Sequence, residues 1–276
     1  MTPDSDEALH AKVNAADPGA VWALGGPDGV LAGSGNDPYG IDPSGNAPSG
    51  DGSCGDGPCG DGSSGNGPSG DGPGAEVVRD VGALAPVVAV WPVLGSLVAR
   101  GELSLHTPIE AHGPTAHQLL TRGAGEGVPA LTRLVEQLCG GPLGDCATEL
   151  IWRPLGMTRT GHDLDGTLRA PLADLGRFLA HLLSPADHPV PRAWTAESLR
   201  IRTGELTPAR GLLWHPGPYG VWSYGEGPAL WISPRLSRWA VLLPAGPGPA
   251  PASLRTAFRE AVFASTAAQA GAVVRS

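Results

Sequence analysis

Apolar and polar positions divide the chain into a sheet-forming start, a helical middle and a sheet-forming end. In residues 19–34 two apolar runs flank the turn sequence Gly26-Pro27-Asp28-Gly29, a pattern that predicts a β-hairpin. Residues 87–100 are almost continuously apolar and predict a buried helix, which Pro92 should kink and Gly101 should end. The first part of the folded chain is thus expected to supply a hairpin and one core helix.

Helical periodicity continues through the middle of the chain. Thr115 is a suitable N-cap for a short helix over 116–122, and further helices are predicted over 130–139, 145–152 and 171–183. The last of these helices places four leucines on one face, which indicates a buried stripe: Leu172, Leu175, Leu179 and Leu182.

The end of the chain returns to strands. Short strands are predicted over 219–224, 228–233 and 238–243, followed by a helix over about 252–270. Together with the early hairpin, these elements predict a mixed α/β (α+β) fold, in which an antiparallel sheet is flanked by helices. Residues 1–34, an N-terminal helix and the hairpin, are expected to belong to that sheet.

A low-complexity tract separates the hairpin from the rest of the chain. From Pro43 the sequence repeats every five residues, as in PSGDG and PCGDG. Calcium-binding β-rolls also carry Gly and Asp, but they need a longer period and an apolar residue in each turn to build a core. We therefore predict a disordered, flexible insertion over 35–74 and one domain over 75–272, with a shortened helical middle (102–200) and C-terminal strands and helix (205–272).

Charge and composition restrict the partners. The net charge is −9, and only Lys12 among the 18 basic residues is a lysine. Nucleic acid and anionic membranes need a basic face, so neither is expected as a partner. No apolar run is long enough to span a bilayer, and the acidic N-terminus does not resemble a signal peptide, so we expect a cytoplasmic location. The partner is then a small molecule or a protein that the sequence does not specify.

Neither a cofactor nor a metal site is predicted. Cys54, Cys59, Cys139 and Cys146 lack zinc or redox spacing, so we interpret them as free thiols. The histidines form no His-Glu-x-x-His or other close ligand pair. Tryptophans can build carbohydrate-binding surfaces, but half of the eight fall in apolar segments and are predicted to pack in the core: Trp91, Trp152, Trp214 and Trp231.

An ordered series of segments resembles the β-lactamase and penicillin-binding-protein family of serine hydrolases, which includes class C β-lactamases, DD-peptidases and esterases. The matches follow the family's order along the chain: RGELSLHTPI (100–109), TAHQLLTRGAG (115–125), WRPLGMTRT (152–160), ADLGRFLAHLLS (173–184), RGLLW (210–214) and ALWISPRLSRWAVLL (229–243). The resemblance implies an antiparallel sheet backed by helices, a cleft between the sheet and a helical region, and acyl transfer through a serine ester.

The family's first catalytic motif is Ser-x-x-Lys at the start of a helix, where the serine attacks and the lysine takes its proton. In DVGALAPVVAVWP (80–92) the resemblance places Ala83 at the serine position and Pro86 at the lysine position. A proline is compatible with a helix start, because the backbone N–H of that turn has no intrahelical partner. We therefore expect the helix that follows residue 83 to form, but not the acyl transfer that Ser-x-x-Lys supports.

The other two motifs are also missing. The Tyr- or Ser-x-Asn motif has no counterpart, since no asparagine follows Asn66. The Lys- or His-x-Gly motif corresponds to Trp222-Ser223-Tyr224, counted back from Ile232-Ser233-Pro234. His215-Pro216-Gly217 matches the His-x-Gly pattern, but it directly follows RGLLW and is interpreted as a turn.

No catalytic residue is therefore predicted. The expected function is that of a degenerate, non-catalytic homologue with a binding or regulatory role. The alternative is a weak esterase, amidase, or hydrolase of β-lactams or D-alanyl peptides that uses an unrecognised nucleophile. Ser96 and Ser104 lie near the motif in sequence, but the chain has no Gly-x-Ser-x-Gly elbow, and a helix serine is more often a packing residue.

Overall fold

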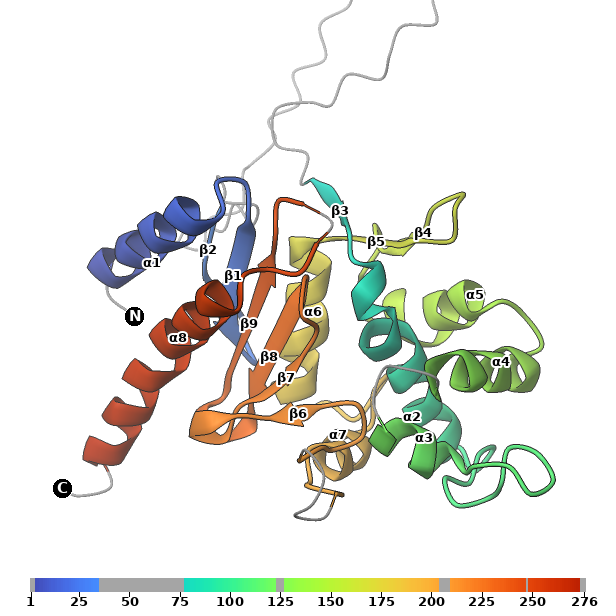
Figure 1. The fold of residues 1–276 in the computed structure, drawn as a ribbon. Helices are drawn as coiled ribbons and strands as arrows, with labels where there is room; N and C mark the ends of the chain where they lie inside the picture. The colour runs from blue at the N-terminus through green and yellow to red at the C-terminus, as the bar shows by residue number, and fades with distance from the viewer. Residues whose placement is uncertain (1–2, 35–76, 123–126, 204–208, 247, 274–276) are drawn as a thin grey trace, which may run out of the picture.

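The core of the protein is an antiparallel sheet in which the two ends of the chain meet. A computed structural model describes residues 3–34, 77–122, 127–203, 209–246 and 248–273. Six strands follow the order β2-β1-β9-β8-β7-β6. They are β1 (Val21–Gly26), β2 (Gly29–Gly33), β6 (His215–Pro216), β7 (Trp222–Tyr224), β8 (Ala229–Ser233) and β9 (Arg238–Leu243). Because β1 pairs with β9, the early hairpin completes the sheet built by the C-terminal strands (Figure 1).

Helices cover both faces of this sheet. Helices α1 (Pro3–Ala16) and α8 (Ala252–Val273) lie on one face, and α6 (Leu172–Leu183) lies on the other, against β9 and β1 (Figure 1). Successive side chains of β9 point to opposite faces of the sheet. Val241 therefore belongs to the core on the α6 side, whereas Leu242 packs with Phe258 of α8. The mixed α/β fold with an antiparallel sheet flanked by helices is thus confirmed.

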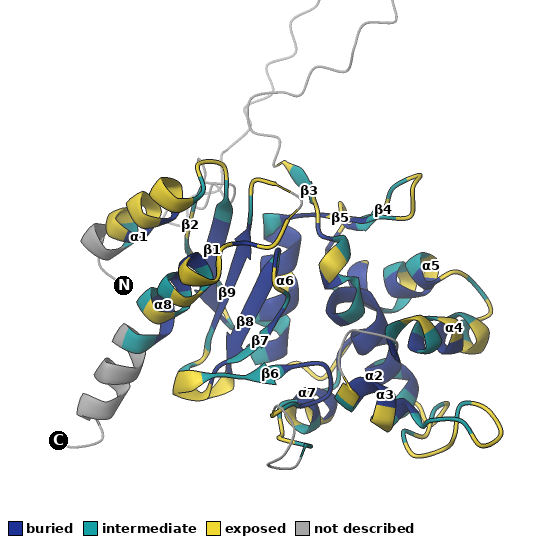
Figure 2. Ribbon diagram, viewed as in Figure 1, coloured by how far each residue is buried: buried dark blue, intermediate teal, exposed yellow. Residues whose placement is uncertain are grey.

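The remaining helices form a second layer beside the α6 face. They are α2 (Trp91–Ala99), α3 (Ala116–Arg122), α4 (Gly127–Cys139), α5 (Leu143–Ala147) and α7 (Arg192–Ser198). A small sheet with the order β3-β5-β4 lies above them, formed by β3 (Val78–Asp80), β4 (Gly161–His162) and β5 (Leu168–Pro171). Figure 2 shows that the side of α2 and α6 between the two layers is buried. Strands β3, β4 and β5 and helix α7 are additional to the elements that the sequence pattern predicts.

Two of the predicted helices contain a π-helical turn. Pro86–Val90 is a π-helix that continues directly into α2, and Thr148–Trp152 is a π-helix that continues from α5. Pro92 explains part of the first irregularity: its ring nitrogen carries no hydrogen, so the carbonyl of Val88, four residues earlier, lacks its α-helical donor. The indole Nε1 of Trp152 donates to that carbonyl at 3.0 Å, which ties the two irregular segments together.

Several local predictions are confirmed. Gly101 ends α2 with a positive φ of 73°, a conformation that costs glycine little. Thr115 caps α3: its Oγ1 accepts from the N–H of Gln118 while the Gln118 side chain accepts from the Thr115 N–H, at 3.2 and 3.0 Å. Three leucines of the predicted α6 stripe are buried and Leu172 is half-buried, and all four tryptophans assigned to the core are buried: Trp91, Trp152, Trp214 and Trp231.

The predicted insertion at 35–74, with Cys54 and Cys59, lies outside the described residues. Cys139 and Cys146 are free thiols, as predicted. Among the helices that the structure describes, none has the length and apolarity to cross a bilayer.

Replacing Trp152 by Phe tests the link to Val88. We expect Trp152→Phe to lower the free energy of unfolding by about 1–3 kcal/mol more than Trp22→Phe, measured by urea denaturation. Trp22 is the matched control, because it is equally buried but its Nε1 has no hydrogen-bond partner among the described residues. Equal costs for the two variants would show that the indole N–H of Trp152 contributes nothing.

Candidate functional site

The segment that resembles the family's nucleophile helix begins at a turn held by backbone and side-chain hydrogen bonds. The Val81 N–H donates to the carbonyl of Leu168 on β5 at 2.9 Å. Asp80 then accepts from the Gly82 N–H at 2.9 Å, and Gly82–Leu84 form one turn of 3₁₀-helix. These bonds fix how residues 83–87 enter the space between the helices and the sheet.

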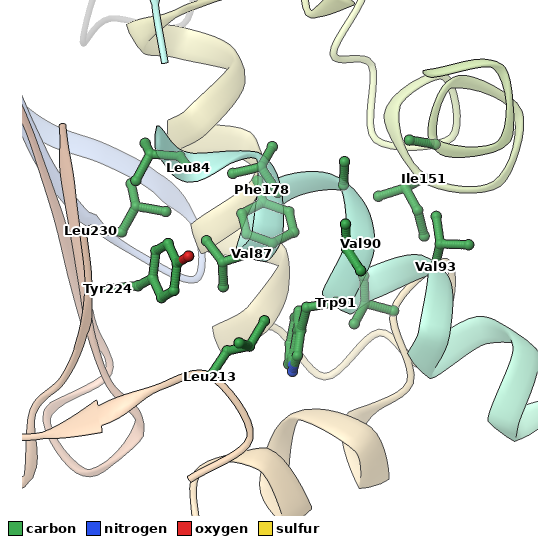
Figure 3. Close-up of a cluster of buried hydrophobic side chains, with 14 of the residues drawn as sticks. Leu84, Val87, Val90, Trp91, Val93, Ile151, Phe178, Leu213, Tyr224 and Leu230 are labelled. Atoms are coloured by element: carbon green, nitrogen blue, oxygen red, sulfur yellow. The ribbon is translucent and has the colours of Figure 1, made fainter. Parts of the chain in front are cut away.

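Apolar side chains fill the contact between this helix start and strand β7. Leu84 and Val87 are each 0% exposed, and they point toward Tyr224 of β7 and Leu230 of β8 (Figure 3). Leu84 approaches the backbone closely: a Cβ placed on Gly225 would lie 3.0 Å from its Cδ2. The side of the helix start that faces β7 and β8 is thus closed by hydrocarbon.

One turn further along, Trp91 extends the same apolar contact. Its ring packs at centroid distances of 5.8 Å from Trp194, 5.9 Å from Trp214 and 6.5 Å from Phe178. Its indole Nε1 donates to Ser198 Oγ at 3.0 Å, so its polar edge is satisfied as well. Leu213 lies next to Trp91 and Val87 (Figure 3), although its φ of +70° is unfavourable for a residue with a Cβ.

The residues assigned to the Ser-x-x-Lys positions lie to the side of this contact. Ala83 is exposed and lines a cavity of about 500 Å³ together with Arg79 and Arg169, and Pro86 is half-buried. The pair of buried residues three positions apart that meets Tyr224 is instead Leu84 and Val87. With either pair, no hydroxyl and no amine stand at the two positions. The spacing of Leu84, Val87 and Trp91 on one helix face is the sequence signal for this buried stripe.

The residues assigned to the third motif make up the whole of β7. Tyr224 is 4% exposed, and burial raises the pKa of its phenol, which therefore stays protonated at neutral pH. Trp222 is half-buried at the other end of the strand. Between them, Ser223 lies directly opposite His215 of β6 in the register of the sheet.

The turn predicted at His215-Pro216-Gly217 is wrong for its first two residues. They form the edge strand β6, and the turn comes after them, where the Gly217 N–H donates to the Val221 carbonyl at 2.7 Å. A proline is tolerated there because an edge strand leaves one side of its backbone unpaired. The sheet therefore brings a histidine next to the strand that carries the third-motif residues.

The geometry of Ser223 and His215 is that of a packed pair rather than a nucleophile and its base. Ser223 Oγ donates to the backbone carbonyl of His215 at 3.4 Å, not to its ring. The ring Nε2 lies 2.8 Å from Nη1 of Arg210. Burial first, and then the Arg210 charge, lower the pKa of His215, so its ring is neutral and its Nε2 accepts from the guanidinium.

Solved structures share the overall fold of this chain. A β-lactamase from Mycobacterium bovis matches with 19% identity and a TM-score of 0.65, covering 91% of this chain and 96% of that one. Simvastatin synthase from Aspergillus terreus matches with 11% identity, a TM-score of 0.69 and coverages of 97% and 99%. A class C β-lactamase from Rhodobacter sphaeroides matches with 13% identity, a TM-score of 0.67 and coverages of 95% and 99%.

The chain has the fold of solved β-lactamases and of a penicillin-binding-protein homologue. No model of a known protein family matches the sequence, and no curated protein matches it either. At these identities the likeness establishes the β-lactamase-like fold and not the reaction. Among the described residues, no group of three or more His, Cys, Asp or Glu side chains is placed to hold a metal ion.

Serine substitutions at two neighbouring positions test which residue faces the interior of this β-lactamase-like fold. We expect Leu84→Ser to lower the free energy of unfolding by about 2–5 kcal/mol, because it leaves a cavity and buries a hydroxyl. Ala83→Ser is the matched control and should change stability by less than about 0.5 kcal/mol, because Ala83 is exposed. Urea denaturation of both variants gives the comparison. A larger cost at Ala83 than at Leu84 would contradict the observed packing.

Proposed function

We propose that this protein is a non-catalytic member of the β-lactamase-like fold that acts by binding a small molecule or a protein. The observation that carries the proposal is the apolar closure of the helix start, where Leu84 and Val87 are fully buried against Tyr224. Acyl transfer needs a nucleophile and a base in hydrogen-bond reach of each other. A leucine and a valine supply neither group.

The position of the single lysine supports this proposal. Lys12 is an exposed residue of α1, which covers the face of the sheet opposite to α6 (Figure 1). No movement of a side chain carries its amine across the sheet to the helix start. No lysine of this chain is therefore placed to act as the family's base.

A weak esterase or amidase is the second candidate, and one observation favours it. Ser223 and His215 are directly opposite in the pairing of β6 and β7, and cross-strand partners lie close enough to interact. For His215 to act as a base, however, its Nε2 must give up its hydrogen bond with Arg210 and accept one from the Ser223 hydroxyl. The resting hydrogen bonds of both residues therefore favour the binding role over hydrolysis.

Acylation decides between the two candidates. The purified protein is incubated with a labelled penicillin and, separately, with an activated ester such as p-nitrophenyl butyrate, and its intact mass is measured. We expect no covalent adduct and no ester turnover above that of Ser223→Ala. A mass increase that maps to Ser223 and is lost in Ser223→Ala would establish the esterase instead.

Restoring the serine and the lysine of the first motif is expected to have no effect on activity. Ala83→Ser combined with Pro86→Lys should not hydrolyse a chromogenic β-lactam above background, because the second and third motifs are also missing. A folded double variant, verified by near-UV circular dichroism, gives the rate to compare with the wild type. Measurable turnover would mean that the rest of the catalytic site is intact.

A further inference from the structure

A cavity of about 680 Å³ lies where α7 meets the end of α6 and the turn that precedes β7. In Figure 1 α7 lies near the lower end of α6, whereas β3 and the helix start lie near its upper end. The volume is within the range of sites that hold drug-sized ligands. The cavity is therefore large enough for a small molecule and does not include the Leu84–Tyr224 contact.

Part of the cavity wall is apolar. Leu182 of α6 is almost fully buried there, Leu199 follows α7, and Trp222 of β7 contributes a half-buried indole. Thr195 also lines the cavity, but its hydroxyl is directed to the carbonyl of Pro191 at 3.4 Å. An aromatic or aliphatic group is the natural occupant of this part of the wall.

The charged groups of the cavity all have the same sign. Arg192 and Arg235 line it, and no aspartate or glutamate does, although the whole chain has a net charge of −9. Neither guanidinium forms an ion pair with any residue that the structure describes. The nearby carboxylate of Asp187 accepts from the backbone N–H of Arg192 at 2.7 Å, not from its guanidinium.

The aliphatic part of the Arg235 side chain lies against the turn at Gly220. A Cβ placed on Gly220 would lie 3.7 Å from Cδ of Arg235, so the side chain extends over the bare backbone of this glycine. Ser233 Oγ donates to the Gly220 carbonyl at 3.1 Å and fixes that backbone. The stem of Arg235 thus lies against this turn, while Arg235 itself is exposed and its guanidinium is open to a ligand.

We propose that this cavity binds a small organic anion with an apolar, aromatic body. The carboxylate or sulfonate group is held by Arg192 and Arg235, and the body rests on Trp222 and Leu182. Because the cavity does not share residues with the Leu84–Tyr224 contact, this inference does not depend on whether the protein is catalytic. It would hold equally for a residual hydrolase.

A pair of dyes tests the site. Anilinonaphthalene sulfonate carries the anion and the aromatic body, and N-phenylnaphthylamine has the same body without the charge. We expect the sulfonate to bind the wild-type protein at least about tenfold more tightly than the neutral dye, with an affinity that falls in about 0.5 M NaCl. Equal affinities, or no binding of the sulfonate, would overturn the proposal.

Charge-matched variants locate the binding. Arg192→Gln with Arg235→Gln should weaken sulfonate binding about tenfold and leave the neutral dye unaffected. Arg100→Gln with Arg153→Gln is the control, because it removes the same net charge from exposed positions away from the cavity. A similar loss in both double variants would reduce the effect to net charge and overturn the proposal.

A filling variant completes the test without changing the charge. Ala193 is exposed on α7 and lines the cavity, so Ala193→Trp should occupy it without disturbing the core. Both dyes should then bind more weakly, while near-UV circular dichroism confirms the native fold. Undiminished binding to Ala193→Trp would place the dyes elsewhere and overturn the proposal.

Discussion

The contact of Leu84 and Val87 with strands β7 and β8 is the interaction on which the rest of the protein depends. It joins the helical layer to the sheet beside the two positions that the resemblance assigns to the family's serine and lysine. Trp91 continues the contact into a cluster with Trp194 and Trp214. A catalytic cleft must keep polar groups and access at this junction, whereas this chain fills it with side chains that exclude water.

This exchange has an energetic reason. Polar groups that are poised for catalysis are costly to bury, because they lose water and gain few partners. Leucine, valine and tryptophan at the same junction gain free energy from burial. Under the proposed non-catalytic role, the side chains at this junction are free to serve packing alone.

The sheet and its main helices were predictable because their patterns are strict. Strands β8 and β9 and helix α6 are long enough to show their periodicity, and the Gly26–Gly29 turn marks the hairpin. The short strands β3, β4 and β5 have two to four residues, too few for a period to show. Strand β6 has only two residues, and its Pro216 indicates a turn when the sequence is considered alone. Only the pairing with β7 identifies these residues as a strand.

The candidate site was predictable in type but not in detail. The absence of a suitable serine, lysine and asparagine is evident from the sequence alone. The proximity of His215 to Ser223 is not, because it depends on the pairing register of β6 and β7. The shared cavity of Arg192 and Arg235 is not evident either, because the two arginines come from segments far apart in the sequence. The filling of the junction lies between these cases: the spacing of Leu84, Val87 and Trp91 indicates a buried face, but not what that face meets.

The π-helix at Pro86–Val90 has a consequence for how this protein is compared with its relatives. A π-helical turn accommodates one residue more than an α-helical turn, so the side chains before it are rotated by about 100° relative to those after it. When this segment is aligned with an uninterrupted α-helix, an alignment anchored on Gly82 and one anchored on Gly101 therefore assign neighbouring residues to the same position. By the same geometry, deletion of one residue in this turn is expected to change which side chains face the junction.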